Sequence, residues 1–128
     1  MKKHNAKTSP RFSGIGDIRP EDFYWLIGIL EGEGCFGITP ARRYKNSVYR
    51  YPKIALQMTD EDIVARVAKL LNTTYSFGPR QKPHKNIFHC SISGARAAEA
   101  MQTMREFMGK RRQAKIGNYI LDSRNGLG

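Results

Sequence analysis

The sequence predicts one α+β domain in which helices cover one face of a four-stranded antiparallel sheet. The first observation is the order of its patterns, which is a helix, two strands, a helix, two strands and two helices. The second is that the strands alternate apolar and polar residues, so the sheet has one core face and one polar face. The third is size, because 128 residues with 40% apolar content suit a single domain with a modest core.

Residues 1–20 form a polar, basic lead that contains Pro10 and Pro20. We expect a loose arm that could touch phosphates. It lacks the apolar core of a signal peptide, so we predict no targeting segment and an intracellular protein. The location would be the cytoplasm or nucleoid, or an organelle matrix if the gene is organellar. The domain itself is expected at 21–122, followed by a frayed tail at 123–128.

The first helix is predicted at about 21–33. Its apolar or glycine run from Phe23 to Leu30 is far shorter than the roughly 20 residues of a membrane span, so no membrane partner is expected. A helix that is apolar all round needs neighbours on all sides. Gly28 and Gly32 lie four residues apart on one face, where a second helix could approach closely.

Two carboxylates occupy the C-terminal end of this helix. Glu31 and Glu33 fall in the last turn before Gly34, where the helix dipole disfavours a carboxylate by roughly 0.3–1 kcal/mol. A divalent cation, a nearby Lys or Arg, or solvation could compensate, and the residues alone leave all three open.

Two strands of different length are predicted next. Phe36 and Ile38 alternate with small or polar residues over a short first strand. The second is expected at Val48–Thr59, and Pro52 near its start argues for an edge position or a bulge, because proline lacks an amide hydrogen. The apolar side of that strand is formed by Ile54, Leu56 and Met58. The turn between the strands carries Arg42, Arg43 and Lys45.

The second helix is expected to open at Thr59, which would form a capping-box-like pair with Asp62, and to end at Asn72. Its apolar stripe is Ile63, Val64, Val67, Leu70 and Leu71. The third and fourth strands are predicted at Thr73–Gly78 and Ile87–Ser93. The loop that joins them is a second basic tip, with Arg80, Lys82, His84 and Lys85.

The last two helices follow directly. Ser93 is expected to cap a helix at Ala95–Met108, which Gly109 ends. The side chains expected to point inward are Ala98, Met101, Met104, Phe107 and Met108. The final helix is predicted at Lys110–Leu121 and is basic at its front.

The charge balance points to a polyanionic partner. Lys plus Arg number 22 and Asp plus Glu 11, which gives a net charge of +11. Nucleic-acid-binding proteins, ribosomal proteins among them, share this balance. Cys35 and Cys90 have no ligand-pair spacing, so we expect reduced thiols and neither a disulfide nor a zinc site.

The polar sheet face and its basic tips suit DNA, because a twisted antiparallel ribbon fits the major groove. Arg and Lys could read guanine there and Gln57 adenine, while the remaining cations neutralise phosphates. The alternative for this face is simple exposure to water, and for His89 it is a surface histidine or a core histidine with satisfied hydrogen bonds. The candidate DNA-contacting residues are Arg42, Arg43, Lys45, Tyr49, Arg50, Lys53, Gln57, Arg80, Lys82, His84, Lys85, His89, Arg111 and Arg112.

The string from Leu26 to Gly34, LIGILEGEG, resembles position by position the motif that names the LAGLIDADG homing endonucleases. The leucine, both glycines, the aliphatic pair and both acidic positions match. It departs in having Glu at both acidic positions, and Cys35 where a small hydroxyl residue is frequent. The resemblance covers residues 22–121 and implies the αββαββα domain of that family.

The resemblance also implies a mechanism. Single-motif members are homodimers that cut both DNA strands across the minor groove of a long, partly palindromic site. The second motif acid, Glu33, would be catalytic and would bind Mg²⁺ together with Gly32, and Mn²⁺ or Ca²⁺ could substitute for binding. Lys110 matches the family's active-site lysine, with Arg112 second, and Asp60 would organise active-site waters or cap a helix. The expected dimer interface is Trp25, Gly28, Ile29 and Gly32.

Three hypotheses follow. The first is a site-specific, Mg²⁺-dependent double-strand DNA endonuclease of a mobile element. The second is a cleavage-impaired protein of the same fold that acts as an intron RNA maturase or a DNA-binding regulator. The third is an unrelated basic RNA-binding protein, which would leave the paired glycines and the two acids without a role. Retention of Glu33 and Lys110 favours the enzyme.

Overall fold

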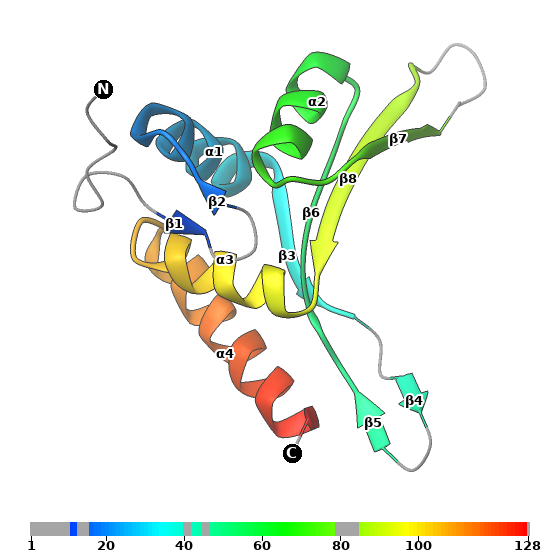
Figure 1. The fold of residues 1–128 in the computed structure, drawn as a ribbon, viewed down its shortest axis with the longest axis vertical. Helices are drawn as coiled ribbons and strands as arrows, with labels where there is room; N and C mark the ends of the chain where they lie inside the picture. The colour runs from blue at the N-terminus through cyan, green and yellow to red at the C-terminus, as the bar shows by residue number, and fades with distance from the viewer. Residues whose placement is uncertain (1–10, 13–15, 40–41, 45–46, 79–84, 128) are drawn as a thin grey trace.

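The computed structural model describes residues 11–12, 16–39, 42–44, 47–78 and 85–127 (Figure 1). In chain order, its elements are β1 (Arg11–Phe12), β2 (Gly16–Asp17), α1 (Pro20–Glu33), β3 (Gly34–Ile38), β4 (Arg42–Tyr44), β5 (Ser47–Tyr49), β6 (Pro52–Met58), α2 (Glu61–Leu70), β7 (Tyr75–Gly78), β8 (Ile87–Ser93), α3 (Ala95–Arg105) and α4 (Lys110–Leu127).

A four-stranded antiparallel sheet in the order β3-β6-β8-β7 forms the centre of the molecule. The helices gather on one side of it and leave the other side uncovered (Figure 1). Along β6, Pro52, Ile54 and Leu56 are buried, whereas Lys53 and Gln57 are exposed. The predicted α+β class, with an antiparallel sheet covered on one face, is confirmed.

The core lies between α1 and the sheet. Phe23, Leu26 and Leu30 of α1 are fully buried, in the same cluster as Ile54 of β6 and Met101 of α3. Burial of a side chain of this size contributes about 1.5–3 kcal/mol, so α1 is held chiefly by packing.

The strand expected at Val48–Thr59 is divided in the structure. β5 ends at Tyr49 and pairs with β4, while β6 begins at Pro52, which lies opposite Ile38 of β3. Of the two alternatives predicted for Pro52, the edge position is wrong, because β6 lies between β3 and β8. The proline is tolerated as the first residue of the strand, where the missing amide hydrogen costs least.

Two helix caps differ from the prediction. The N-cap of α2 is Asp60 and not Thr59, and no side chain makes a capping hydrogen bond there. The N-cap of α3 is Gly94, whose φ of 79° lies in the left-handed region that favours glycine. Ser93 cannot serve as that cap, because it is the last residue of β8.

The two C-terminal helices end at residues that differ from those predicted. α3 ends at Arg105, before Phe107, whose side chain is 42% exposed although its ring packs edge-on against the buried Phe23. α4 continues to Leu127, so the chain is helical beyond Leu121, where the tail was expected to fray.

The basic lead is partly attached to the domain. Residues 1–10 and 13–15 lie outside the described part of the chain. β1 and β2 pair with each other, β1 contacts α3, and Ile18 belongs to the core. The packed unit therefore begins before residue 21.

Candidate functional site

A helix passes directly into a strand at the end of α1. Gly34 starts β3, and a Cβ at this position would lie 2.7 Å from the carbonyl oxygen and 2.8 Å from the Cα of Leu30. Only glycine allows this close approach. The junction therefore fixes Glu33, the last residue of α1, at the end of the sheet where β3 begins.

Glu33 is exposed and has no hydrogen-bond or ion-pair partner among the described residues. Gly32 beside it is exposed too, and carbonyl groups in the last turn of a helix have no intrahelical donors. A carboxylate and a main-chain carbonyl are the oxygen ligands that Mg²⁺ and Ca²⁺ prefer. The donor set at Glu33 and Gly32 therefore fits a divalent cation.

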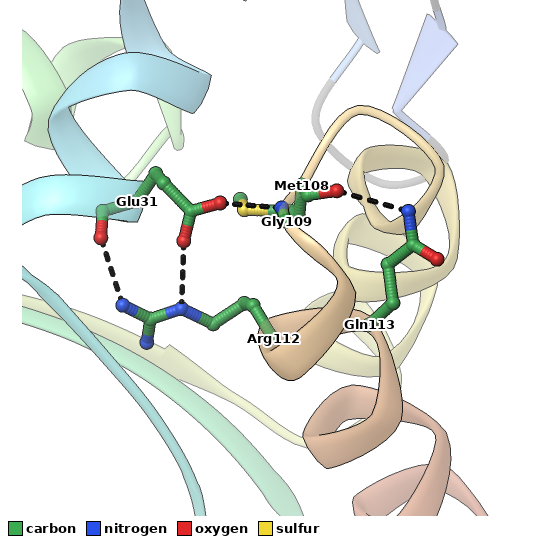
Figure 2. A network of polar contacts seen from close by, with 5 residues as sticks. All are labelled: Glu31, Met108, Gly109, Arg112 and Gln113. Atoms are coloured by element: carbon green, nitrogen blue, oxygen red, sulfur yellow. Dashed lines mark hydrogen bonds and ion pairs between the residues drawn. The ribbon is translucent and has the colours of Figure 1, made fainter.

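Glu31, the other acid of the pair, is fully engaged by the start of α4 (Figure 2). Its Oε1 accepts a hydrogen bond from the Gly109 amide at 2.6 Å, and its Oε2 accepts one from Nε of Arg112 at 3.1 Å. Nη2 of Arg112 also donates to the Glu31 carbonyl oxygen at 2.8 Å. We call these three bonds the Glu31 clamp. They lower the pKa of Glu31, chiefly through the Gly109 amide and then through Arg112.

At Glu31, the clamp shows what compensates the unfavourable position of a carboxylate at the negative end of the helix dipole, namely the positive charge of Arg112. Arg112 was expected among the DNA-contacting residues. The structure directs it to Glu31, with its side chain only 17% exposed and its guanidinium 5.0 Å above the ring of Phe36. The positive charge of Arg112 is therefore paired with Glu31 at the C-terminal end of α1.

Lys110 follows the clamp directly. It is the first residue of α4, one position after Gly109, and its exposed side chain has no partner among the described residues. The same turn is closed by Gln113, whose Nε2 donates to the Met108 carbonyl oxygen at 2.9 Å (Figure 2). The clamp thus brings the start of α4, with Lys110, to the end of α1 that carries Glu33.

The end of β6 reaches the same region. Gly34 pairs with Leu56, so Gln57 lies one residue beyond that pair and Asp60 follows as the N-cap of α2. Gln57 and Asp60 are exposed, and the carboxylate of Asp60 makes no capping hydrogen bond. Chain topology therefore places Glu33, Gln57 and Asp60 at one end of the sheet.

The uncovered face of the sheet is polar. Gln57, His89 and Ser76 lie side by side on β6, β8 and β7, and the Ser76 hydroxyl is 3.0 Å from Nδ1 of His89. Lys53 is exposed on the same face of β6. Sequence reasoning missed Ser76, because only the strand register shows that it faces His89.

The other candidate DNA-contacting residues divide into two groups. Arg50, Lys85 and Arg111 are exposed. Lys45, Arg80, Lys82 and His84 lie outside the described residues, as do the side chains of Arg42, Arg43 and Tyr49.

A basic pocket runs along α4. Its volume is about 460 Å³, and its described lining consists of Arg111, Arg112, Lys115 and Asn118. Lys115 and Asn118 were not among the predicted site residues. Lys115 lies four residues and Asn118 seven residues after Arg111 on one helix, and this spacing on one helix face could have suggested them.

One face of α1 is open. A Cβ placed on Gly28 or Gly32 would meet no atom within 4 Å, and Tyr24 beside them is 55% exposed. Ile29 is half-buried, and Trp25 is partly covered by the Arg66 guanidinium, 3.8 Å from its ring. The helix predicted to have neighbours on all sides therefore has none along its glycine face among the residues that the structure describes.

Within the described ranges, no group of three or more His, Cys, Asp or Glu side chains could hold a metal. No helix in that part of the chain has both the length and the apolar character needed to cross a membrane.

No protein-family model matches the sequence, and a search of curated proteins found no similar sequence. Solved structures do match. The homing endonuclease I-CvuI, in complex with its target, has a TM-score of 0.62 and 12% identity over 84% of this chain and 71% of its own. The LAGLIDADG homing endonuclease I-GzeII, in complex with its DNA target, has a TM-score of 0.57 and 14% identity over 83% of this chain and 38% of its own. The archaeal intron-encoded homing endonuclease I-Vdi141I, complexed with DNA, has a TM-score of 0.51 and 10% identity over 73% of this chain and 61% of its own. The chain therefore has the fold of the LAGLIDADG homing endonucleases.

Proposed function

We propose that this protein is a divalent-metal-dependent DNA endonuclease that acts as a homodimer on a long, partly palindromic target. The observation that carries the proposal is the contrast between the two motif acids. Glu31 is satisfied by the protein, whereas Glu33 is exposed and without a partner among the described residues. A carboxylate without a protein partner at the negative end of a helix would be stabilised by an external cation.

Each candidate active-site residue has a distinct role. The Glu33 carboxylate and the Gly32 carbonyl would hold the cation. A bound divalent cation supplies charge stabilisation at the phosphate and lowers the pKa of a bound water. The Lys110 ammonium would face the negative charge that develops on the phosphate, and the Asp60 carboxylate would accept a hydrogen bond from a water.

The homodimer is supported by the open face of α1. Close approach of two helices requires small residues at the contact, and no described residue fills the space beside Gly28 and Gly32. Pairing along this face would bring two copies of Glu33 together. Each copy would then serve one strand of the duplex.

DNA as the partner is supported by charge and shape. The net charge is +11, and Lys53, Gln57 and His89 lie on the uncovered, antiparallel sheet face. The solved structures of I-GzeII and I-Vdi141I, which have the same fold, are complexes with DNA, and that of I-CvuI is a complex with its target.

The test is cleavage of a target selected for this protein. Duplexes that the purified protein retains from a randomised pool would be incubated with it in Mg²⁺, Mn²⁺ or Ca²⁺, or with a chelator. We expect double-strand cuts with Mg²⁺ or Mn²⁺ and none with the chelator. Tight, sequence-specific binding without any cut would instead favour the cleavage-impaired regulator or maturase.

Glu33→Gln is the variant that tests the metal role. Cleavage should fall by roughly 100-fold or more, because the variant loses the carboxylate that holds the charge-stabilising cation. DNA affinity, measured by a gel-shift titration, should stay equal or rise, since a negative charge beside phosphates is removed. Normal cleavage by the Gln variant would show that Glu33 does not hold the metal.

A further inference from the structure

The start of α4 is attached to the end of α1 by a single acidic residue. Both carboxylate oxygens of Glu31 accept hydrogen bonds, one from the Gly109 amide at 2.6 Å and one from Arg112 at 3.1 Å. The Glu31 carbonyl oxygen accepts a third bond, from the same guanidinium, at 2.8 Å. A carboxylate that binds an amide and a guanidinium together fixes direction as well as distance.

Lys110 and Glu33, the two candidate active-site groups, each lie within two residues of a residue of the clamp. Lys110 is one residue from Gly109, so their Cα atoms lie about 3.8 Å apart. Glu33 is two residues from Glu31, a rise of about 3 Å along the helix. All three hydrogen bonds of the clamp join the last turn of α1 to the first turn of α4 or the residue just before it.

We propose that Glu31 is a positioning residue, which sets Lys110 against Glu33 by holding the first turn of α4 to the last turn of α1. This inference rests on the proposed function. It assigns to the first motif acid a role that differs from metal binding, namely to orient the lysine that faces the phosphate. A shift of about 1 Å in such a group can cost on the order of 100-fold in rate.

Glu31→Gln is the direct test, because an amide can serve only one of the two donors and turns its own NH₂ toward the other. The rate of single-turnover cleavage should fall about 10- to 100-fold, while DNA affinity stays unchanged. An unchanged rate would overturn the inference.

A double-mutant cycle separates positioning from general loosening of the fold. If Glu31 acts through Lys110, Glu31→Gln should have little further effect on the residual rate of Lys110→Met. If Glu31→Gln lowered the cleavage rate by the same factor in wild type and in Lys110→Met, Glu31 would act independently of Lys110. That result would overturn the inference.

Arg105→Gln provides a matched control, because it removes a different hydrogen bond to α4. Nε of Arg105 donates to the Gln113 carbonyl oxygen at 2.9 Å, so Arg105 holds α4 from α3 without contacting Glu31. Its cleavage rate should stay within about twofold of wild type, since the Glu31 clamp remains intact. If Arg105→Gln lost as much cleavage rate as Glu31→Gln, any loosening of α4 would explain the loss. That result would overturn the inference.

Amide exchange distinguishes failure of this inference from failure of the proposed function. Hydrogen exchange at Gly109 should be faster in Glu31→Gln and unchanged in Arg105→Gln, whether or not DNA is cut. Wild-type cleavage with unchanged Gly109 exchange in Glu31→Gln would overturn the clamp and leave the nuclease standing. If the wild-type chain cut no DNA with any divalent metal, the proposed nuclease function would be overturned, and the positioning role of Glu31 with it. This would hold even if faster Gly109 exchange in Glu31→Gln confirmed the hydrogen bond between Glu31 and Gly109.

Discussion

At the scale of single residues, the two cysteines have opposite surroundings. Cys90 is buried on the helix side of β8, and burial raises the pKa of its thiol to about 11. Cys35 is exposed on β3, and its neighbour Phe36 points into the core. Because side chains alternate along a strand, Cys35 lies on the uncovered sheet face. A thiol reagent should therefore distinguish the two faces of the sheet.

We predict one fast-reacting thiol in the folded protein. Disulfide-exchange labelling at about pH 8 should modify Cys35 readily and Cys90 only on unfolding, because the reactive species is the thiolate. Cys35→Ser should remove the fast phase. Bound DNA should slow the labelling of Cys35 if the uncovered face is the DNA-binding surface. Labelling of Cys90 before Cys35 would contradict the burial of β8.

At the scale of elements, the direct passage from α1 to β3 depends on Gly34. Gly34→Ala should destabilise the fold by about 1–3 kcal/mol, because the new methyl group would overlap the main chain of Leu30. Chemical denaturation measures this change. Gly37→Ala on the same strand is the control, since a Cβ there meets nothing within 4 Å. Equal stability of the two variants would mean that the junction is not tight.

Sequence patterns predicted the elements well where local chemistry decides them. The strand at Ile87–Ser93 has the expected bounds, since its apolar residues alternate without interruption. The predicted cap of α3 is wrong, because Ser93 pairs within the β8 ladder and leaves Gly94 as the cap. Competition between a strand and a cap depends on tertiary pairing, which a local pattern does not contain.

The candidate site, too, could be predicted from the sequence only where residues close together in the chain define it. The acidic pair and the glycine pair are contiguous in the sequence and could be read from it directly. The division of labour between Glu31 and Glu33 could not, because the partner of Glu31 lies 81 residues away at Arg112. Only the folded chain shows which of the two acids is satisfied.

At the scale of the whole molecule, the open face of α1 predicts the oligomeric state. Gly28→Leu should convert a dimer into a monomer, because its side chain would fill the space that a second helix needs. A Cβ at Gly28 meets no atom of the described residues within 4 Å, so the variant should still fold, with a normal circular dichroism spectrum. Light scattering on a size-exclusion column measures the mass. A variant that remains dimeric would place the interface elsewhere.

The distribution of charge predicts which face of the molecule meets DNA. Lys53 lies on the uncovered sheet face, whereas Lys69 is exposed on α2, on the side of the sheet that the helices cover. Both lysines contribute equally to the net charge, so any difference between their variants reports on position alone. Lys53→Gln should weaken DNA binding and reduce the slope of log affinity against log salt concentration by about one. Lys69→Gln should leave that slope unchanged. The salt dependence of fluorescence anisotropy on a labelled duplex measures both, and a larger effect at Lys69 would move the DNA to the helical side.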